Sequence, residues 1–267
     1  MPENPLLPDV ALRTLLAQTR RCTALETPSR GKSGVSPRRS FQIGREALLA
    51  ATTSQLEVGD LFVPEAEDAS AIALAAPLSG EAGPSVVCLP DHLPKSTSRL
   101  LAAAAMAAAL QKPKDQPIGN DPSRFNRVVL TLMRAGTADT AWQAALTWAQ
   151  KSLLPLVVVC SDISGPAAFL PKPARAKSAK AKDAFNWTTV SPIASTLQLA
   201  VLTLDGDDAV AMYRATQEAL LRARMGGGPA ILWAALPTAA ESAQRPRSQR
   251  ALPRLAQYLR TRGISPS

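Results

Sequence analysis

The sequence predicts an α/β fold: a doubly wound, mainly parallel sheet with helices on both faces. Short apolar runs alternate with amphipathic segments along most of the 267 residues, which is typical of parallel strands joined by crossover helices. Residues 127–164 contain the clearest unit, with VVLTL, then ADTAWQAALTWAQKSLL, then LPLVVVC. This order predicts strand, helix, strand. Hydrophobic residues make up 46% of the chain, enough for a sizeable core, and we expect a single domain over residues 1–267.

The remaining elements follow from periodicity and from start and stop signals. The expected helices are 5–22, 44–56, 65–78, 96–111, 138–154, 191–199, 207–225 and 252–263. The expected strands are 59–64, 128–132, 154–160, 200–206 and 227–236, with surface loops at 81–95 and 112–126. Asp207 at the start of the helix 207–225 complements the helix dipole, and Gly226 just after it is a stop signal. The Ala-rich helix 96–111 lacks bulk, which suggests that it is buried.

The net charge of +9 is concentrated in two segments, 20–39 and 171–185. Both are rich in Ser, Pro, Gly or Ala, and we expect them to be solvated basic loops. Nucleic-acid binding would need basic residues interleaved with aromatic ones on one face. That interleaving is absent, so we do not expect nucleic acid as a partner.

The composition also favours a cytoplasmic protein. The three cysteines, Cys22, Cys88 and Cys160, match no disulfide or metal pattern, as expected in a reducing compartment. The start of the chain does not have the form of a secretory signal. The longest apolar run, LLAAAAMAAAL at 100–110, is too short to span a bilayer, so we expect no membrane association.

Besides residues 127–164, four segments carry distinctive sequences: 38–51, 59–70, 204–234 and 252–264. Together these segments resemble the α subunits of thiamine-diphosphate-dependent 2-oxo acid dehydrogenases. RRSFQIGREALLAA (38–51) is similar to that family's "FHxxIGQEA" helix, and GDLFVPEAEDAS (59–70) to its "DxxxPxYRDHG" stretch. Residues 127–164 resemble its "GDGATxxGxxHEALN…LPVVFVCENN" unit. LDGDDAVAMYRATQEALLRARMGGGPAILWA (204–234) and LPRLAQYLRTRGI (252–264) resemble its last strand–helix–strand unit and closing helix. The resemblance implies a thiamine-diphosphate-binding fold.

In that family the α subunit holds the diphosphate and a magnesium ion, and the metal ligands come from "GDG" and "ENN". An ungapped alignment anchored on Leu146 and Pro155 puts the ligand Asp of "GDG" at Arg134 and the second Asn of "ENN" at Ile163. Magnesium needs oxygen ligands. Arg134 is a cation, and Ile163 has no donor atom. Asp162 keeps a carboxylate but cannot form this site alone.

The other positions implied by the resemblance have also changed. The Arg and His of "YRDHG" fall on Glu67 and Ala69, and the His of "FH" falls on Ser40. A carboxylate at Glu67 would repel a diphosphate. The only histidine of the chain, His92, lies in another segment, where we expect it to be solvated. The resemblance therefore predicts degenerate cofactor, metal and catalytic positions.

The exchange of charges suggests one contact. Where the family has an Arg and a metal-binding Asp, this chain has Glu67 and Arg134, and we hypothesise that the two form an ion pair in the vacated site. The alternative is two unrelated solvent-facing residues. A separation beyond about 8 Å would exclude a direct pair.

Three functions are open to the sequence. The first is a non-catalytic homologue of the α subunit, without thiamine diphosphate or magnesium, that acts as a structural or regulatory partner of a β-subunit-like protein or of a second copy. The alternative is an active oxidoreductase subunit that works with a β subunit and holds thiamine diphosphate and magnesium by other residues. The third is a small-molecule or nucleic-acid binder that reuses the fold and contacts its ligand through the basic loops.

Overall fold

The computed structural model describes residues 7–26, 45–65, 69–75, 83–89, 98–111, 127–163, 184–238, 241 and 244–265. Its helices are α1 (Asp9–Glu26), α2 (Glu46–Thr53), α3 (Ala69–Ala75), α4 (Arg99–Leu110), α5 (Trp142–Lys151), α6 (Trp187–Leu197), α7 (Ala209–Arg224) and α9 (Ala251–Thr261), with a 3-10 turn at Arg247–Gln249. Its strands are β1 (Leu61–Val63), β2 (Ser85–Val86), β3 (Val129–Arg134), β4 (Thr137–Ala138), β5 (Leu156–Asp162), β6 (Ala184–Phe185), β7 (Ala200–Asp205) and β8 (Ala230–Ala235).

The described strands form one six-stranded parallel sheet in the order β2-β1-β3-β5-β8-β7, with β4 and β6 as a separate antiparallel pair. The central strands β3, β5 and β8 are buried almost throughout, because helices cover both faces. A fully covered parallel strand reads as a continuous apolar run. That is why VVLTL and LPLVVVC were recognisable as strands.

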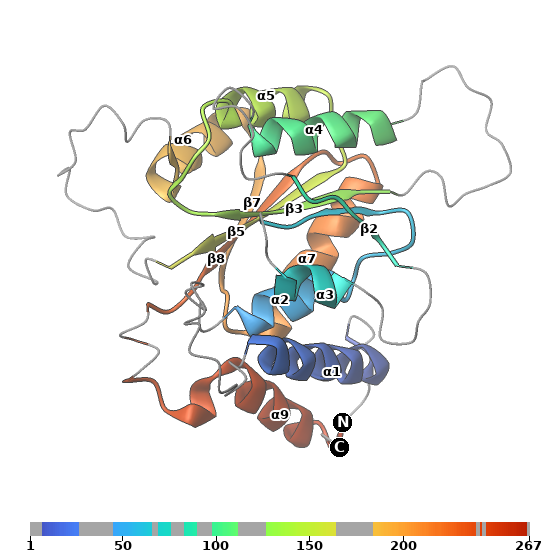
Figure 1. Cartoon of the computed structure of the whole chain (residues 1–267), viewed down its shortest axis with the longest axis vertical. Helices are drawn as coiled ribbons and strands as arrows, with labels where there is room; N and C mark the ends of the chain where they lie inside the picture. The colour runs from blue at the N-terminus through green and yellow to red at the C-terminus, as the bar shows by residue number, and fades with distance from the viewer. Residues whose placement is uncertain are drawn as a thin grey trace, which may run out of the picture.

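Two layers of helices enclose the sheet (Figure 1). Helices α4, α5 and α6 lie on one side, over a core that includes Trp142, Leu146 and Trp233. Helices α1, α2, α3, α7 and α9 lie on the other side, over a core that includes Leu48 and Phe62. The doubly wound, mainly parallel fold predicted from the sequence is confirmed.

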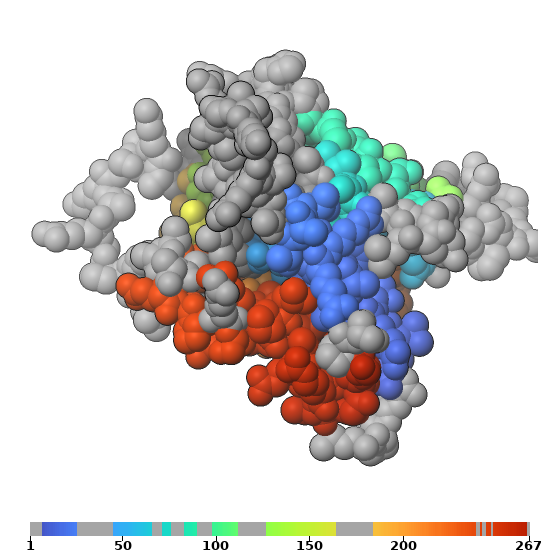
Figure 2. Space-filling view, turned by 60° about the horizontal axis from the view of Figure 1, so that its bottom comes forward, coloured from blue at the N-terminus to red at the C-terminus, as the bar shows by residue number. Residues whose placement is uncertain are grey.

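Helices α1 and α9 come from the two ends of the described chain and lie side by side (Figure 2). The Arg262 guanidinium just after α9 reaches the Leu7 carbonyl oxygen at 3.5 Å and the Asp9 carboxylate at 4.0 Å. Buried Leu12 and Leu259 belong to the same core cluster. The closing helix is therefore part of the domain and not an appendage.

The helix stops work as predicted at the Gly-rich turn. The Gly226 N–H donates to the Ala223 carbonyl at 3.2 Å, and the Gly227 N–H donates to the Arg222 carbonyl at 2.9 Å. These two bonds form a Schellman motif, which needs a left-handed residue just past the helix. Gly226 supplies it with φ +75°. The glycines thus end α7 and turn the chain into β8.

Some element boundaries differ from the predictions. The segment 20–39 was expected to be a loop, but its first part, to Glu26, is helical in α1. The expected loop 81–95 contains the short edge strand β2, and the basic segment 171–185 ends in β6. Residues 27–39 and 171–183 lie outside the described residues. Neither short strand has the length that a periodic pattern needs to stand out.

Two helices also differ. Helix α6 begins four residues earlier than expected, at Trp187, because Asn186 caps it: its side-chain oxygen accepts from the Thr189 N–H at 3.0 Å. Helix α4 is not wholly buried. Its Ala103 and Ala107 are inaccessible, whereas Ala105 and Ala109 are exposed. Small side chains let α4 approach its neighbours closely on one face only.

Candidate functional site

The candidate site lies at the point in the sheet where the strand order reverses, between β1 and β3. From β1 the chain crosses to β2 on one side, whereas from β3 it crosses to β5 on the other. Open α/β sheets bind ligands at such a switch point, beyond the carboxyl ends of the strands. Glu65 follows β1 by two residues, and Arg134 is the last residue of β3. Because β1 and β3 are paired in parallel, both residues reach this edge.

Glu65 and Arg134 form an ion pair there. Arg134 Nη2 donates to Glu65 Oε2 at 2.7 Å. The Glu65 side chain is largely buried at 14% exposure, whereas that of Arg134 is 46% exposed. The pair therefore has a protected carboxylate and a half-exposed cation at the switch point.

Two further polar groups face the same carboxylate. Arg45 Nη2, at the start of α2, lies 4.0 Å from Glu65 Oε1, and its side chain is only 8% exposed. The Ser161 hydroxyl, from β5, lies 3.4 Å from Glu65 Oε1 and 3.3 Å from the Met133 carbonyl oxygen. Glu65 is thus surrounded by donors from α2, β3 and β5. The carboxylate thus faces two guanidinium groups and one hydroxyl.

Asp162 ends β5 beside this pair but points into a different contact. The Trp233 indole N–H donates to Asp162 Oδ2 at 3.0 Å, and both side chains are buried. Its backbone carbonyl accepts from the Leu236 N–H at 2.7 Å. Ile163, the next residue, is 45% exposed. The carboxylate that the sequence left as a possible ligand is therefore bonded to an indole of β8.

The remaining predicted positions are only partly within the described residues. Arg134 and Asp162 lie at the ends of neighbouring strands, since Arg134 pairs in register with Ser161. Ala69 is the first residue of α3, with its side chain outside the description, and Ser40, Glu67 and His92 also lie outside it. The hypothesised Glu67–Arg134 pair consequently stays a prediction.

The sequence reasoning missed Glu65. The aligned motif directed attention to Glu67, whereas the carboxylate seen beside Arg134 is two residues earlier. A signal was present: Glu65 comes two residues after the short strand β1, and the carboxyl ends of neighbouring parallel strands meet at one edge. A topology-based search would have paired the first charged residue after β1 with the last residue of β3.

Cys160 is part of the sheet core next to this site. It is fully buried, and burial raises the pKa of its thiol well above the usual value, with the Asp162 and Glu65 carboxylates adding to the effect. Nucleophilic cysteines need an accessible thiolate. Cys160 is accordingly suited to packing.

The LDGDD sequence serves a structural role at the start of α7. Asp208 caps the helix, with Oδ1 accepting from the Val210 and Ala211 N–H groups at 3.1 and 3.0 Å. Arg254 of α9 donates to Asp205 and Asp208, each at 2.9 Å. The motif therefore attaches the closing helix to the carboxyl edge of the sheet.

Asp207, in the same motif, is bonded to Arg245 Nη1 at 2.6 Å. Burial raises the pKa of its carboxyl to about 6, against the lowering effect of Arg245, and Glu46 and Asp205 raise it further.

Within the described part of the chain, no group of three or more His, Cys, Asp or Glu residues is arranged to hold a metal ion.

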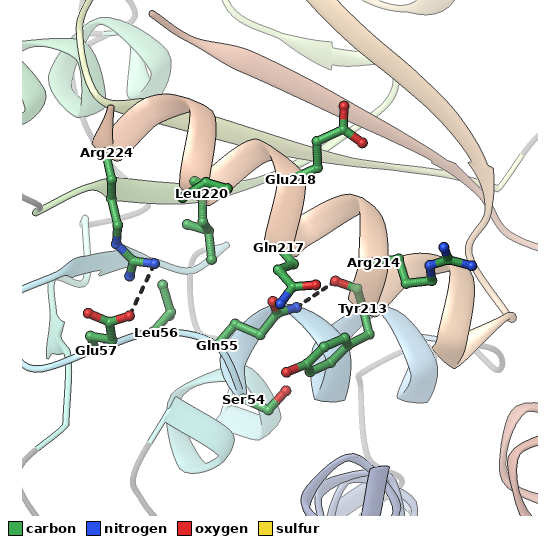
Figure 3. A pocket seen from close by; sticks show the side chains of 11 residues that line it. Ser54, Gln55, Leu56, Glu57, Tyr213, Arg214, Gln217, Glu218, Leu220 and Arg224 are labelled. Atoms are coloured by element: carbon green, nitrogen blue, oxygen red, sulfur yellow. Dashed lines mark hydrogen bonds and ion pairs between the residues drawn. The ribbon is translucent and has the colours of Figure 1, made fainter. Parts of the chain in front are cut away.

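Residues of α7 and of the turn after α2 line a groove (Figure 3). Both helices lie on the opposite side of the sheet from α4, α5 and α6 (Figure 1). The volume of the groove is about 660 Å³, and it is lined by the end of α2, the turn after it and one side of α7. Gln55 Nε2 donates across it to the Tyr213 carbonyl at 2.8 Å, and Arg224 bonds to Glu57 at 3.3 Å (Figure 3). The groove is separate from the switch-point residues.

Residues 175–235 match the family model of the dehydrogenase E1 component. The match covers less than a quarter of the chain and includes the LDGDD and GGGP sequences together with β6, α6, β7, α7 and β8. It does not reach Glu65, Arg134 or Asp162. A comparison with curated proteins gives no match.

The matched segment agrees in place with the sequence resemblance drawn over residues 204–234. It is the part of the chain where LDGDD caps α7 and where the Gly-rich turn leads into β8.

No helix among the described residues is long and apolar enough to cross a membrane.

Proposed function

We propose that this chain is a non-catalytic homologue of the α subunit of 2-oxo acid dehydrogenases, and that it acts as a structural or regulatory partner subunit. The observation that carries the proposal is the Glu65–Arg134 ion pair at the switch point. It lies where the resemblance implies a diphosphate and a magnesium ion.

The residues at this edge do not fit that cofactor. A magnesium ion prefers carboxylate and carbonyl oxygens in octahedral geometry. Arg134 contributes a cation at one implied ligand position, and Ile163 contributes a hydrocarbon side chain at the other. The remaining carboxylate, Asp162, is bonded to the Trp233 indole. Glu65 adds a negative charge where a negatively charged diphosphate would have to bind. Like charges repel strongly at a partly buried site.

In the proposed role the chain has the fold of such a subunit without the residues that bind the cofactor and the metal. The match of residues 175–235 to the dehydrogenase E1 component family supports descent from such a subunit. The ion pair supports a site that is stable without a ligand, because each charge has its partner within the chain. A subunit of this kind contributes surface, and we propose a β-subunit-like protein or a second copy of the chain as the partner.

The first test is calorimetric titration of the purified full chain with thiamine diphosphate, with and without magnesium chloride. We expect no saturable heat at millimolar cofactor, either for the chain alone or with any β-like subunit that co-purifies. Saturable, magnesium-dependent binding would contradict the proposal and favour the active oxidoreductase subunit.

The variant Arg134→Ala serves as the matched control for location. If the wild-type chain binds and Arg134→Ala changes the affinity, the cofactor lies at the switch point and the proposed loss of the site is wrong. Release of carbon dioxide from a 2-oxo acid by the chain with its β-like partner would contradict the proposal independently of calorimetry.

A further inference from the structure

The exposed side of α7 carries a stripe of side chains that nothing in the described chain covers. Arg214, Glu218, Leu221 and Met225 are exposed and follow one another at spacings of four, three and four residues. This spacing puts them on one line along a helix, as at the seam of a coiled coil. Leu221 is 56% and Met225 78% exposed. Large apolar side chains at that spacing mark a surface for another helix.

The neighbouring stripe of α7 is already in use. Tyr213, Gln217, Leu220 and Arg224 each precede one member of the exposed stripe by one residue, and they line the groove against the end of α2 (Figure 3). Val58, in the turn after α2, adds an apolar side chain that is 63% exposed. The exposed stripe thus forms the rim of a groove, the shape that accepts a helix in helix-in-groove recognition.

The groove is poorly suited to a small polar ligand. Gln55 Nε2 is taken by the Ala51 and Tyr213 carbonyl oxygens, at 3.0 and 2.8 Å. The Arg224 guanidinium forms ion pairs with Asp60 at 2.6 Å and with Glu57 at 3.3 Å. The strongest donors along the groove therefore serve the fold, and what is left for a partner is the apolar and charged rim.

From this arrangement we infer that α7 is a self-association surface, on which the α7 helix of a second copy of this chain packs antiparallel to the first. A two-fold axis at the midpoint of the stripe pairs Arg214 with the second copy's Met225, and Glu218 with its Leu221. Such an isologous contact uses the same patch twice. The inference deepens the proposed partner role, on which it rests.

Charge complementarity favours a second copy over an unrelated helix. The acidic Glu218 lies on the rim of the groove, and the basic Arg222, also exposed, lies one turn later on α7. Antiparallel pairing about the same axis brings each Glu218 next to the Arg222 of the other copy. Leu221 and Met225 then pack against the aliphatic stems of Glu218 and Arg214. A parallel arrangement would bring like charges together.

The test measures the oligomeric state of the full chain by sedimentation equilibrium over micromolar concentrations. We expect a dimer for the wild type, and we expect Leu221→Glu/Met225→Glu to raise the dissociation constant by at least about tenfold. Val10→Glu is the matched control, because Val10 is 75% exposed on α1 and its substitution should leave the dimer intact. Circular dichroism checks that each variant is folded.

A charge exchange tests the antiparallel register. Glu218→Arg alone and Arg222→Glu alone should each weaken the dimer, and the double variant should restore most of the lost affinity. A wild-type monomer at all concentrations would overturn the inference, as would a dimer that survives Leu221→Glu/Met225→Glu or a double variant weaker than both single ones. Cofactor titration reports on the switch point and sedimentation on α7, so either idea can fail while the other holds.

Discussion

Arg134 Nη2 lies 2.7 Å from Glu65 Oε2, so the last residue of β3 is tied to a carboxylate that follows β1. The contact joins two strands across the switch point of the sheet. Its two partners are unequally protected, since the Glu65 side chain is 14% exposed and that of Arg134 46%. Substitution of the two residues should therefore have unequal effects.

Glu65→Ala should destabilise the protein more than Arg134→Ala. Removing the carboxylate takes away the acceptor that Arg45 and Arg134 share at a partly buried position, which costs about 1–3 kcal/mol of unfolding free energy. Removing the half-exposed Arg134 should cost less than about 1 kcal/mol. Urea unfolding followed by circular dichroism measures both values. The reverse order would mean that Glu65 is not the charge that holds this edge together.

Asp162→Ala should leave the buried Trp233 indole N–H without its acceptor. We expect a loss of about 1–3 kcal/mol, the usual cost of an unsatisfied buried donor. Asp162→Asn keeps a carbonyl oxygen at the position and is the matched control, with a smaller loss. Urea unfolding monitored by tryptophan fluorescence compares them. Equal stability of Asp162→Ala and the wild type would show that the indole contact contributes nothing.

Asp207 should give the stability a pH dependence between about pH 4 and pH 6. The folded-state pKa is raised from 3.8 to about 6, mainly by burial. The folded chain therefore holds this proton more tightly than the unfolded chain does. The resulting contribution to stability is complete below the unfolded pKa and is lost as the pH rises through about 6.

The variant Asp207→Asn removes the titrating group and should flatten that part of the curve. The measurement is urea unfolding at intervals from about pH 4 to pH 7, with the difference between wild type and variant plotted against pH. Asp9→Asn, on α1, controls for loss of one negative charge away from Arg245. A difference that stays constant across the range, or that grows in favour of the wild type as the pH rises, would contradict the raised pKa.

Gly226→Ala should cost about 1–2 kcal/mol, because a Cβ disfavours the left-handed conformation that the Schellman motif needs. An added Cβ would meet no heavy atom within 4 Å, so the cost should be conformational and not steric. Gly226→Asn should cost less, since Asn tolerates that conformation better. Thermal or urea unfolding ranks the two variants. An Asn variant as unstable as the Ala variant would mean that some other contact limits this turn.

The fold could be predicted from the sequence because its signals are local. Buried strands such as VVVC read as apolar runs, and α7 has a capping Asp and a Gly stop within one stretch of chain. The short strands β2, β4 and β6 could not be predicted. Two residues are too few for a periodic signal. These segments are strands only because their backbone pairs with a neighbouring strand in the folded chain.

The candidate site was predictable in position but not in its contacts. Alignment identified Arg134, Asp162 and Ile163 at the carboxyl ends of β3 and β5, and the sheet has these residues at that edge. The motif predicts Glu67 as the partner of Arg134, and this residue lies outside the described part of the chain. The Glu65 contact that the structure shows was not predicted. Nothing local to β5 indicates that Asp162 bonds to an indole seventy-one residues later in the chain.

By itself, the sequence determined the order of the helices and of the longer strands, the burial of the central strands and the kinds of side chain at the switch point. Periodicity and composition are properties of neighbouring residues, so they survive without knowledge of the packing. Only the tertiary structure decided which charges meet. In a strand or a tight turn, a shift of one or two residues redirects a side chain to another neighbour, and that choice depends on how β1, β3 and α2 pack together.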